Sequence, residues 1–160
     1  TGTLSGILGE DIDCFQSQFI WKNPGASGQP WHQDTHDFPF DKGPHIGVWL
    51  ALTEATLQNG CLSVLPGTHR DPIHHHGPDK RPNSLLGYLE VDVDPARKVV
   101  PMLMQPGDVL FFHGYLLHKS EDNKSYGMRA ALVYRYGPAG AKQLGDPNPV
   151  VHFVPARRAA

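Results

Sequence analysis

The sequence predicts an all-β domain, either a sandwich or a barrel, on the strength of three observations. Seventeen glycines and 15 prolines are spread over 160 residues, which favours short strands over long helices. Short runs of apolar, aromatic and β-branched residues recur between turn residues. No long stretch has the periodicity of an amphipathic helix, so we expect helices to be few and short. Many short strands separated by frequent turns are typical of sandwiches and barrels.

Each predicted strand has its own signature. Residues 13–22 alternate polar and apolar side chains, which indicates a strand with two different faces. Residues 46–52 are β-branched and aromatic with little polarity, as expected of a strand that is buried on both faces. Four further runs between turn residues are also predicted strands: 61–65, 99–104, 109–117 and 128–136.

Two segments are expected to have little regular structure. Residues 68–94 contain proline, glycine and charged residues, and loops of this length are often lids or binding loops. This segment leaves the core beside a strand end, so we expect a mobile lid over a site there. The tail from Gly137 is also rich in proline and glycine and is predicted to be irregular.

The composition excludes several classes of function. The net charge is −2 and no cluster of Lys and Arg occurs, which argues against a nucleic-acid partner. No apolar run is long enough for a membrane span, and no signal-peptide pattern opens the chain. Cys14 and Cys61 form no C-x-x-C pair and are expected to be free buried thiols, which suits a reducing, cytoplasmic setting. The composition gives no indication of the oligomeric state.

The length predicts one domain, residues 1–160, with a proper core. Thr1 is not an initiator methionine, and the first residues resemble the end of a longer segment. We therefore expect the domain to lack an N-terminal portion.

A candidate metal site begins at residues 31–34, whose sequence is W-H-Q-D. His32 and Asp34 are two residues apart, so on an extended backbone both side chains point to the same side and can contact one metal ion. A second histidine from far along the chain would complete two imidazoles and one carboxylate. That set is typical of non-haem Fe(II) oxygenases, because it leaves open positions for a cosubstrate and O₂.

Residues 109–136 are predicted to form a β-hairpin that supplies the second histidine. A loop centred between Asn123 and Lys124 places His118 opposite Arg129, and directly opposed residues share a face. His113 then faces the other way. An arginine beside a metal-binding histidine suits bidentate binding of a carboxylate on a ligand that also contacts the metal.

Five motifs in order resemble the phytanoyl-CoA dioxygenase family. They are W-H-Q-D, D-F-P-F, N-G-C-L-S-V-L-P-G-T-H-R, P-G-D-V-L-F-F-H, and H-x-S with an arginine eleven residues after its histidine. The resemblance covers about residues 15–136. It implies an Fe(II)- and 2-oxoglutarate-dependent oxygenase on a double-stranded β-helix, a cupin-like jelly roll with long loops and few short helices.

The resemblance also implies roles for individual residues. His32, Asp34 and His118 would be the iron ligands, and Arg129 would bind the distal carboxylate of 2-oxoglutarate beside the Ser120 hydroxyl. Trp49 would line the cosubstrate pocket. Gln18 aligns with a pocket position that varies in the family.

Structural interpretations of the same residues stay open. His118 could be a buried, hydrogen-bonded histidine, with His113 as the rival ligand. Arg129 could form a surface ion pair with Glu121 or Asp122, which would contribute little stability. Trp49 could belong to the core and Ser120 could cap a turn. Residues 74–76, three consecutive histidines, are expected in an exposed polar loop.

The implied reaction is hydroxylation of a C–H bond in a small organic metabolite, using O₂ and 2-oxoglutarate and releasing succinate and CO₂, with ascorbate as an optional stimulant. Because related halogenases have a small residue in place of Asp34, its carboxylate favours hydroxylation over halogenation. A CoA thioester is less favoured than a free metabolite, because its phosphates would need a basic patch. The residues that could form one are Arg70, Lys80, Arg81 and Lys98.

Two alternative functions are a non-catalytic jelly-roll binding protein and a cupin-type metalloenzyme that does not use 2-oxoglutarate. The intact set of ligands argues against the first alternative. Arg129 argues against the second, because such an enzyme needs no anchor for a carboxylate.

Overall fold

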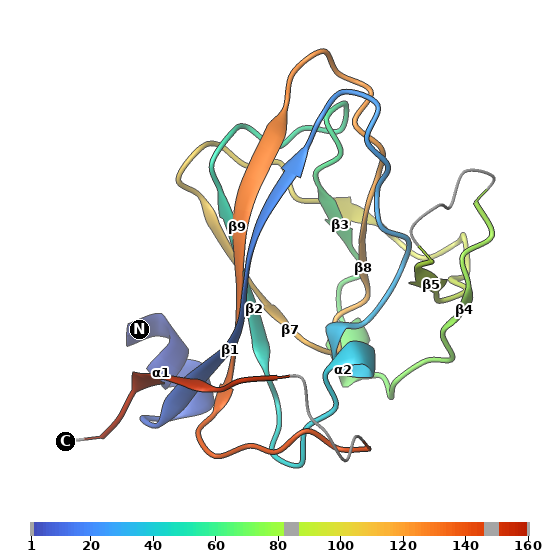
Figure 1. The fold of residues 1–160 in the computed structure, drawn as a ribbon. Helices are drawn as coiled ribbons and strands as arrows, with labels where there is room; N and C mark the ends of the chain where they lie inside the picture. Colours follow the sequence, from blue (N-terminus) through green and yellow to red (C-terminus); the bar gives the residue numbers. More distant parts are fainter. Residues whose placement is uncertain (1, 82–86, 146–150, 160) are drawn as a thin grey trace.

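The computed structural model describes residues 2–81, 87–145 and 151–159. Two antiparallel sheets lie opposite each other, with the large sheet on one side of the domain and β3 and β8 on the other (Figure 1). The large sheet has the order β10-β1-β9-β2-β7: Val154–Arg157, Ile12–Lys22, Arg129–Pro138, Ile46–Ala51 and Val109–His113. The small sheet has the order β6-β3-β8: Val100–Pro101, Leu62–Val64 and His118–Ser120. This arrangement confirms the all-β, double-stranded β-helix prediction.

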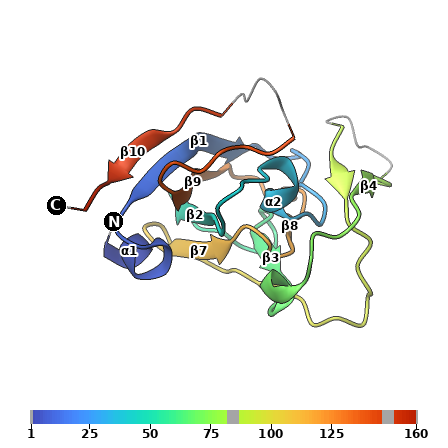
Figure 2. The same ribbon diagram turned by 90° about the horizontal axis from the view of Figure 1, so that it is seen from below.

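The remaining elements are short. Strands β4 and β5 form a separate ribbon beside the small sheet (Figures 1 and 2). The helices are α1, α2 and the single 3₁₀ turn η1, and α2 lies at one end of the space between the sheets (Figure 2). No helix among the described residues is long and apolar enough to cross a membrane. The bounds of these elements are Gly77–Pro78 (β4), Leu89–Glu90 (β5), Gly2–Leu8 (α1), Asp34–Asp37 (α2) and Thr68–Arg70 (η1).

The predicted hairpin over residues 109–136 is wrong. Strand β7 pairs with β2, β8 pairs with β3, and β9 lies between β1 and β2. Arg129 is therefore opposite Lys22, and His113 is opposite Ile46. The reason is a turn directly after β7, closed by a 2.8 Å hydrogen bond from the Leu116 amide to the His113 carbonyl. This turn ends the strand and carries the chain from the large sheet to the small one.

The chain ends also differ from expectation. The tail contributes β10, which pairs with β1, and the first residues form α1. Leu4 of α1 packs with Ile12 and Ile46, and Ala156 of β10 contacts this cluster. The apolar positions of these short segments are too few for a periodic pattern, so packing against the large sheet decides their structure. Of the other predicted strands, β1 and β9 occur one residue longer than predicted, while β2, β3, β6 and β7 are shorter.

The two cysteines are free, as expected: Cys61 is buried and Cys14 is half-buried. The main core lies between the two sheets and includes Trp49, Phe112 and Val133. The ring of Phe112 also contacts His118, with 4.8 Å between ring centroids.

Gly47 of β2 allows this ring to occupy its position. A Cβ atom on Gly47 would lie 2.3 Å from Cζ of Phe112, far inside normal contact distance. We therefore expect Gly47→Ala to displace the ring and to lower the free energy of unfolding by about 1–3 kcal/mol. A thermal melt should show a decrease of several degrees.

Gly127→Ala is the matched control, because a Cβ there meets no atom within 4 Å. It should leave the melting temperature unchanged or raise it slightly. Equal effects of the two substitutions would show that the close contact at Phe112 is not responsible.

Candidate metal centre and adjoining cavity

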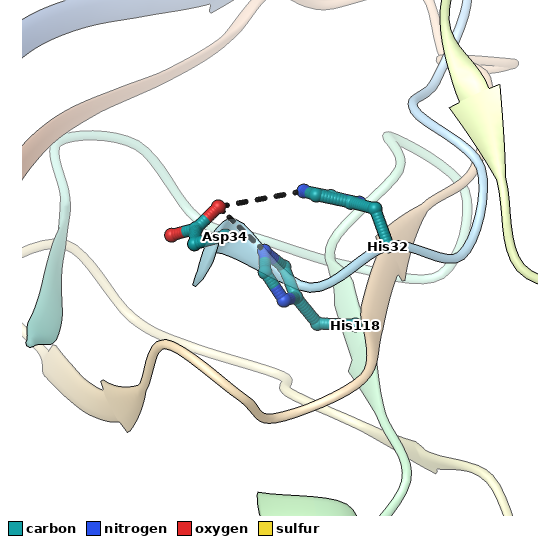
Figure 3. Close-up of side chains that lie close together, drawn as sticks. All are labelled: His32, Asp34 and His118. Atoms are coloured by element: carbon teal, nitrogen blue, oxygen red, sulfur yellow. Dashed lines mark ion pairs between the residues drawn. The ribbon is translucent and has the colours of Figure 1, made fainter. Parts of the chain in front are cut away.

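His32, Asp34 and His118 lie together with their ligand atoms within 4.8 Å of one another (Figure 3). Nε2 of His32 is 3.6 Å and Nε2 of His118 is 3.7 Å from the same oxygen, Oδ1 of Asp34. All three side chains are buried. The structure thus brings together the three residues that the sequence predicted, although not through the predicted hairpin.

A β-bridge between His32 and His118, rather than the predicted hairpin, brings the two histidines together. The His32 amide donates to the His118 carbonyl at 3.0 Å, and the His118 amide donates to the His32 carbonyl at 3.1 Å. Gln33 has the extended conformation expected for H-x-D, with φ −121° and ψ 124°, but α2 begins at Asp34. The helix start turns the carboxylate toward the two imidazoles.

Each histidine has a fixed orientation. Nδ1–H of His32 donates to the Pro30 carbonyl at 2.8 Å, and Nδ1–H of His118 donates to the Leu116 carbonyl at 2.9 Å. Because a carbonyl only accepts, Nε2 keeps its lone pair and faces the cluster. Burial, together with the neighbouring His32, lowers the pKa of His118 to about 3. The imidazole is therefore neutral at physiological pH, as a metal ligand must be.

Arg135 of β9 is a site residue that sequence reasoning missed. Its Nε donates to Oδ2 of Asp34 at 2.7 Å and its Nη2 donates to Oδ1 at 2.9 Å. Burial alone would raise the pKa of Asp34, but Arg135 and His32 hold it well below its usual value, so the carboxylate is ionised. Arg135 follows Arg129 by six residues on the same strand, an even spacing that places both on one face. That spacing was the available signal.

A cavity of about 470 Å³ adjoins the cluster between the two sheets. Strand β1 contributes Gln16, Gln18 and Lys22 to its wall, and their partners on β9, Arg135, Val133 and Arg129, line it as well. Its lining includes Gln18, Lys22, Trp49, Ser120, Arg129 and Arg135.

Arg129 lies at the wall of this cavity and is only 2% exposed. Its Nη2 donates to the Gly60 carbonyl at 2.9 Å and its guanidinium lies 5.5 Å from the centre of the Trp49 ring. Its Nε is buried without a hydrogen-bond partner among the described residues. Arg129 forms no ion pair with Glu121 or Asp122, both of which the structure describes. A buried guanidinium with a free donor fits the carboxylate of a small ligand.

The other predicted pocket residues have mixed positions. Trp49 lines the cavity and also belongs to the core, so both interpretations hold. Oγ of Ser120 accepts from the Gln29 amide at 3.2 Å and from Nζ of Lys22 at 3.0 Å. Oε1 of Gln18 accepts from Nη1 of Arg135 at 3.1 Å. Sequence reasoning missed Lys22, although its even spacing from Gln18 on one strand was a usable signal.

His113 and His69 lie outside the cluster. Their rings contact each other at 5.8 Å between centroids, and Nδ1 of His113 accepts from the Tyr115 amide. His113, the rival ligand, is therefore already engaged away from the three candidate ligands.

The described part of residues 68–94 packs against the segment that carries His32 and Asp34. The Gln33 side chain is fully buried; its Nε2 donates to the Pro72 carbonyl at 3.2 Å and its Oε1 accepts from the His74 amide at 2.8 Å. The Gln33 amide donates to Nε2 of His76, which is buried rather than exposed as predicted. Tyr88 lines the cavity. The described part of this segment is therefore packed against its neighbours, and not loosely packed as its composition suggested. Residues 82–86 lie outside the described part.

Comparisons with known proteins agree with this geometry. The phytanoyl-CoA dioxygenase of Rattus norvegicus, named as peroxisomal, is 35% identical over 146 residues, which are 86% of this chain and 43% of the rat protein. The methylphosphonate hydroxylase of Gimesia maris is 32% identical over 140 residues, which are 88% of this chain and 51% of that protein. This chain thus spans about half the length of these curated relatives.

A solved structure has a similar fold and a detectable sequence identity to this chain. EvdO2 from Micromonospora carbonacea var. aurantiaca, complexed with 2-oxoglutarate, is 27% identical with a TM-score of 0.73, covering 92% of this chain and 60% of the other. The sequence model described as phytanoyl-CoA dioxygenase (PhyH) matches residues 3–131, most of the chain. The chain therefore belongs to the phytanoyl-CoA dioxygenase family.

Proposed function

We propose that this chain forms the iron- and 2-oxoglutarate-binding domain of a dioxygenase that hydroxylates a C–H bond of a small organic metabolite. The observation that carries this proposal is a two-histidine, one-carboxylate cluster in the wall of the same cavity as a buried arginine with a free donor. Such ligands suit Fe(II), and such an arginine suits the distal carboxylate of 2-oxoglutarate. Family membership and the 2-oxoglutarate complex of EvdO2 support the same assignment.

When bound, iron and 2-oxoglutarate supply the oxidation by O₂, with succinate and CO₂ as products. The residues of the chain position and shield these groups. His32, Asp34 and His118 hold the metal, and Arg135 keeps the Asp34 carboxylate ionised and oriented. Arg129 anchors the cosubstrate, and the Trp49 ring forms an apolar wall against water.

Two further parts of the proposal concern setting and subclass. The Asp34 carboxylate is present as a candidate ligand, which supports hydroxylation over halogenation. The cytoplasmic setting expected from the cysteines stays a prediction, and curated relatives named as peroxisomal offer a different location.

The first prediction for this function concerns the metal. The purified chain should bind one Fe(II), and His118→Ala should abolish binding because it removes one of the three candidate ligands found among the described residues. Equilibrium dialysis under anaerobic conditions, with the metal quantified, measures this directly.

His113→Ala is the matched control, because His113 lies outside the cluster. It should leave the stoichiometry at one Fe(II) per chain. The assignment of His118 as a ligand is wrong if the two variants behave the other way round.

The second prediction concerns Arg129. Arg129→Lys keeps a charge but loses the planar pair of donors, so affinity for 2-oxoglutarate should fall by about 1.5–3 kcal/mol, roughly 10- to 100-fold. Calorimetric titration of the Mn²⁺-loaded protein gives this affinity. The affinity for the metal alone should hardly change; a parallel loss of both would indicate that Arg129 is structural.

The third prediction concerns the substrate. Lys80 forms an ion pair with Asp92 and Arg81 forms one with Asp79, so each cation has a carboxylate beside it that repels the phosphates of CoA. We therefore expect free acids, amines or phosphonates to stimulate succinate formation more than acyl-CoA thioesters do. The assay uses Fe(II), O₂, 2-oxoglutarate and ascorbate, with His118→Ala as the inactive control.

Strong turnover of a long-chain acyl-CoA that is lost in the double variant Lys80→Ala, Arg81→Ala would overturn this preference. Absence of succinate formation with every compound, and of uncoupled 2-oxoglutarate decarboxylation, would favour a binding protein instead.

A further inference from the structure

Two buried cations lie side by side at one end of the cavity. Lys22 of β1 and Arg129 of β9 are direct cross-strand partners, and they are 5% and 2% exposed. Both converge on Gly60: Nη2 of Arg129 donates to its carbonyl at 2.9 Å, and Nζ of Lys22 lies 3.0 Å from the position of a Cβ built there. Like charges directly opposite each other in a sheet are destabilising.

Neither cation has a carboxylate partner in the part of the chain that the structure describes. Nζ of Lys22 donates to Oγ of Ser120 at 3.0 Å and to the Glu121 carbonyl at 2.6 Å, both neutral groups. The carboxylate of Glu121 pairs with Lys119, and Oδ1 of Asp122 accepts from the Gly28 amide. Lys22 keeps a third ammonium donor beyond these two bonds. Buried charges without counter-ions are costly, so this pair is suited to an anionic ligand.

The position of the pair relative to the metal cluster indicates which anion. Ser120 and His118 are two residues apart on β8 and both are buried, so their side chains share a face about 7 Å apart. Lys22 contacts Ser120, so the two cations lie about one strand repeat from a candidate metal ligand. A short dicarboxylic acid can contact the metal with one end and the cations with the other.

We propose that Lys22 is a second cationic anchor for the cosubstrate: Lys22 and Arg129 bind the distal carboxylate of 2-oxoglutarate together and select a dicarboxylic 2-oxo acid over a monocarboxylic one. This inference rests on the proposed function. Lys22 lies outside the five family motifs, the first of which begins at Trp31.

The competing explanation is structural, since Lys22 also holds the backbone at Glu121 and the side chain of Ser120. The titration of the Lys22 ammonium distinguishes a ligand-binding role from a purely structural one. Burial and Arg129 lower the pKa of Lys22 to about 7, while Asp122 and Glu121 after β8 and Cys61 before β3 oppose this decrease.

A bound dianion favours the charged ammonium and raises its pKa. Binding above pH 7 therefore takes up a proton, and affinity for 2-oxoglutarate falls as pH rises, by at most about tenfold per pH unit. A lysine that only braces the backbone gives no such dependence.

The experiment measures the Kd of 2-oxoglutarate and of 2-oxobutanoate for the Mn²⁺-loaded full chain between pH 6 and 9. In the native protein the Kd for 2-oxoglutarate should rise with pH. Lys22→Met should raise it about tenfold or more at pH 6.5 and remove the pH dependence, with little effect on 2-oxobutanoate. Lys22→Arg should bind 2-oxoglutarate tightly without pH dependence, because its guanidinium stays charged.

Lys124→Met is the matched control, since it removes the same charge from an exposed position in the loop after β8. It should match the native protein throughout. The inference is overturned if Lys22→Met keeps the native Kd, or if it weakens both oxo acids equally. If it does not fold, a native Kd that is constant with pH overturns it as well. Failure of the native protein to bind 2-oxoglutarate would instead contradict the proposed function.

Discussion

Two backbone hydrogen bonds between His32 and His118 hold the candidate site together. They attach the segment before α2 to β8, so two imidazoles separated by 86 positions in the sequence are fixed with their rings 4.1 Å apart. Asp34 then needs only one turn of chain to reach both. The other charged residues of the cavity contact neighbours of this bridge: Arg135 binds Asp34, and Lys22 binds Ser120, two residues after His118. A backbone bond is a robust device here, because it does not depend on side-chain identity.

The charged residues on the inner faces of β1 and β9 differ in their partners at the two ends of the cavity. At one end Arg135 is neutralised by Asp34, while at the other Lys22 and Arg129 lie together with no carboxylate bonded to either among the described residues. Six residues separate the two arginines along β9, about 20 Å of extended strand. The cavity thus has one end where charge is balanced by the protein and another where it is left for a ligand.

The sequence predicted the strands and the candidate ligands better than it predicted their pairing. The H-x-D pattern and the motif around His118 identify the residue types that hold a metal, because that chemistry restricts them strongly. The pairing of β8 with β3 rather than with β9 depends on the turn from His113 to Leu116, whose one turn residue, Gly114, lies inside an apolar and aromatic run that resembles a single strand. Lys22 and Arg135 were missed for a related reason. Their importance arises from partners on other elements, Asp34 of α2 for Arg135 and Ser120 of β8 for Lys22, and the order of residues along one strand does not reveal those partners.

The side chain of Gln33 links two segments of the site, residues 31–34 and residues 72–76. It stands between the two candidate ligands of one segment, yet its amide group holds Pro72 and His74 of another. A rearrangement of residues 72–76 that broke these bonds would leave the buried Oε1 of Gln33 without its donor, and only the bond from Nε2 to the Tyr115 carbonyl would remain. The packing of residues 72–76 and the positions of the two candidate ligands are therefore coupled, and a substitution in that segment must preserve the partners of Gln33 to keep His32 and Asp34 in place.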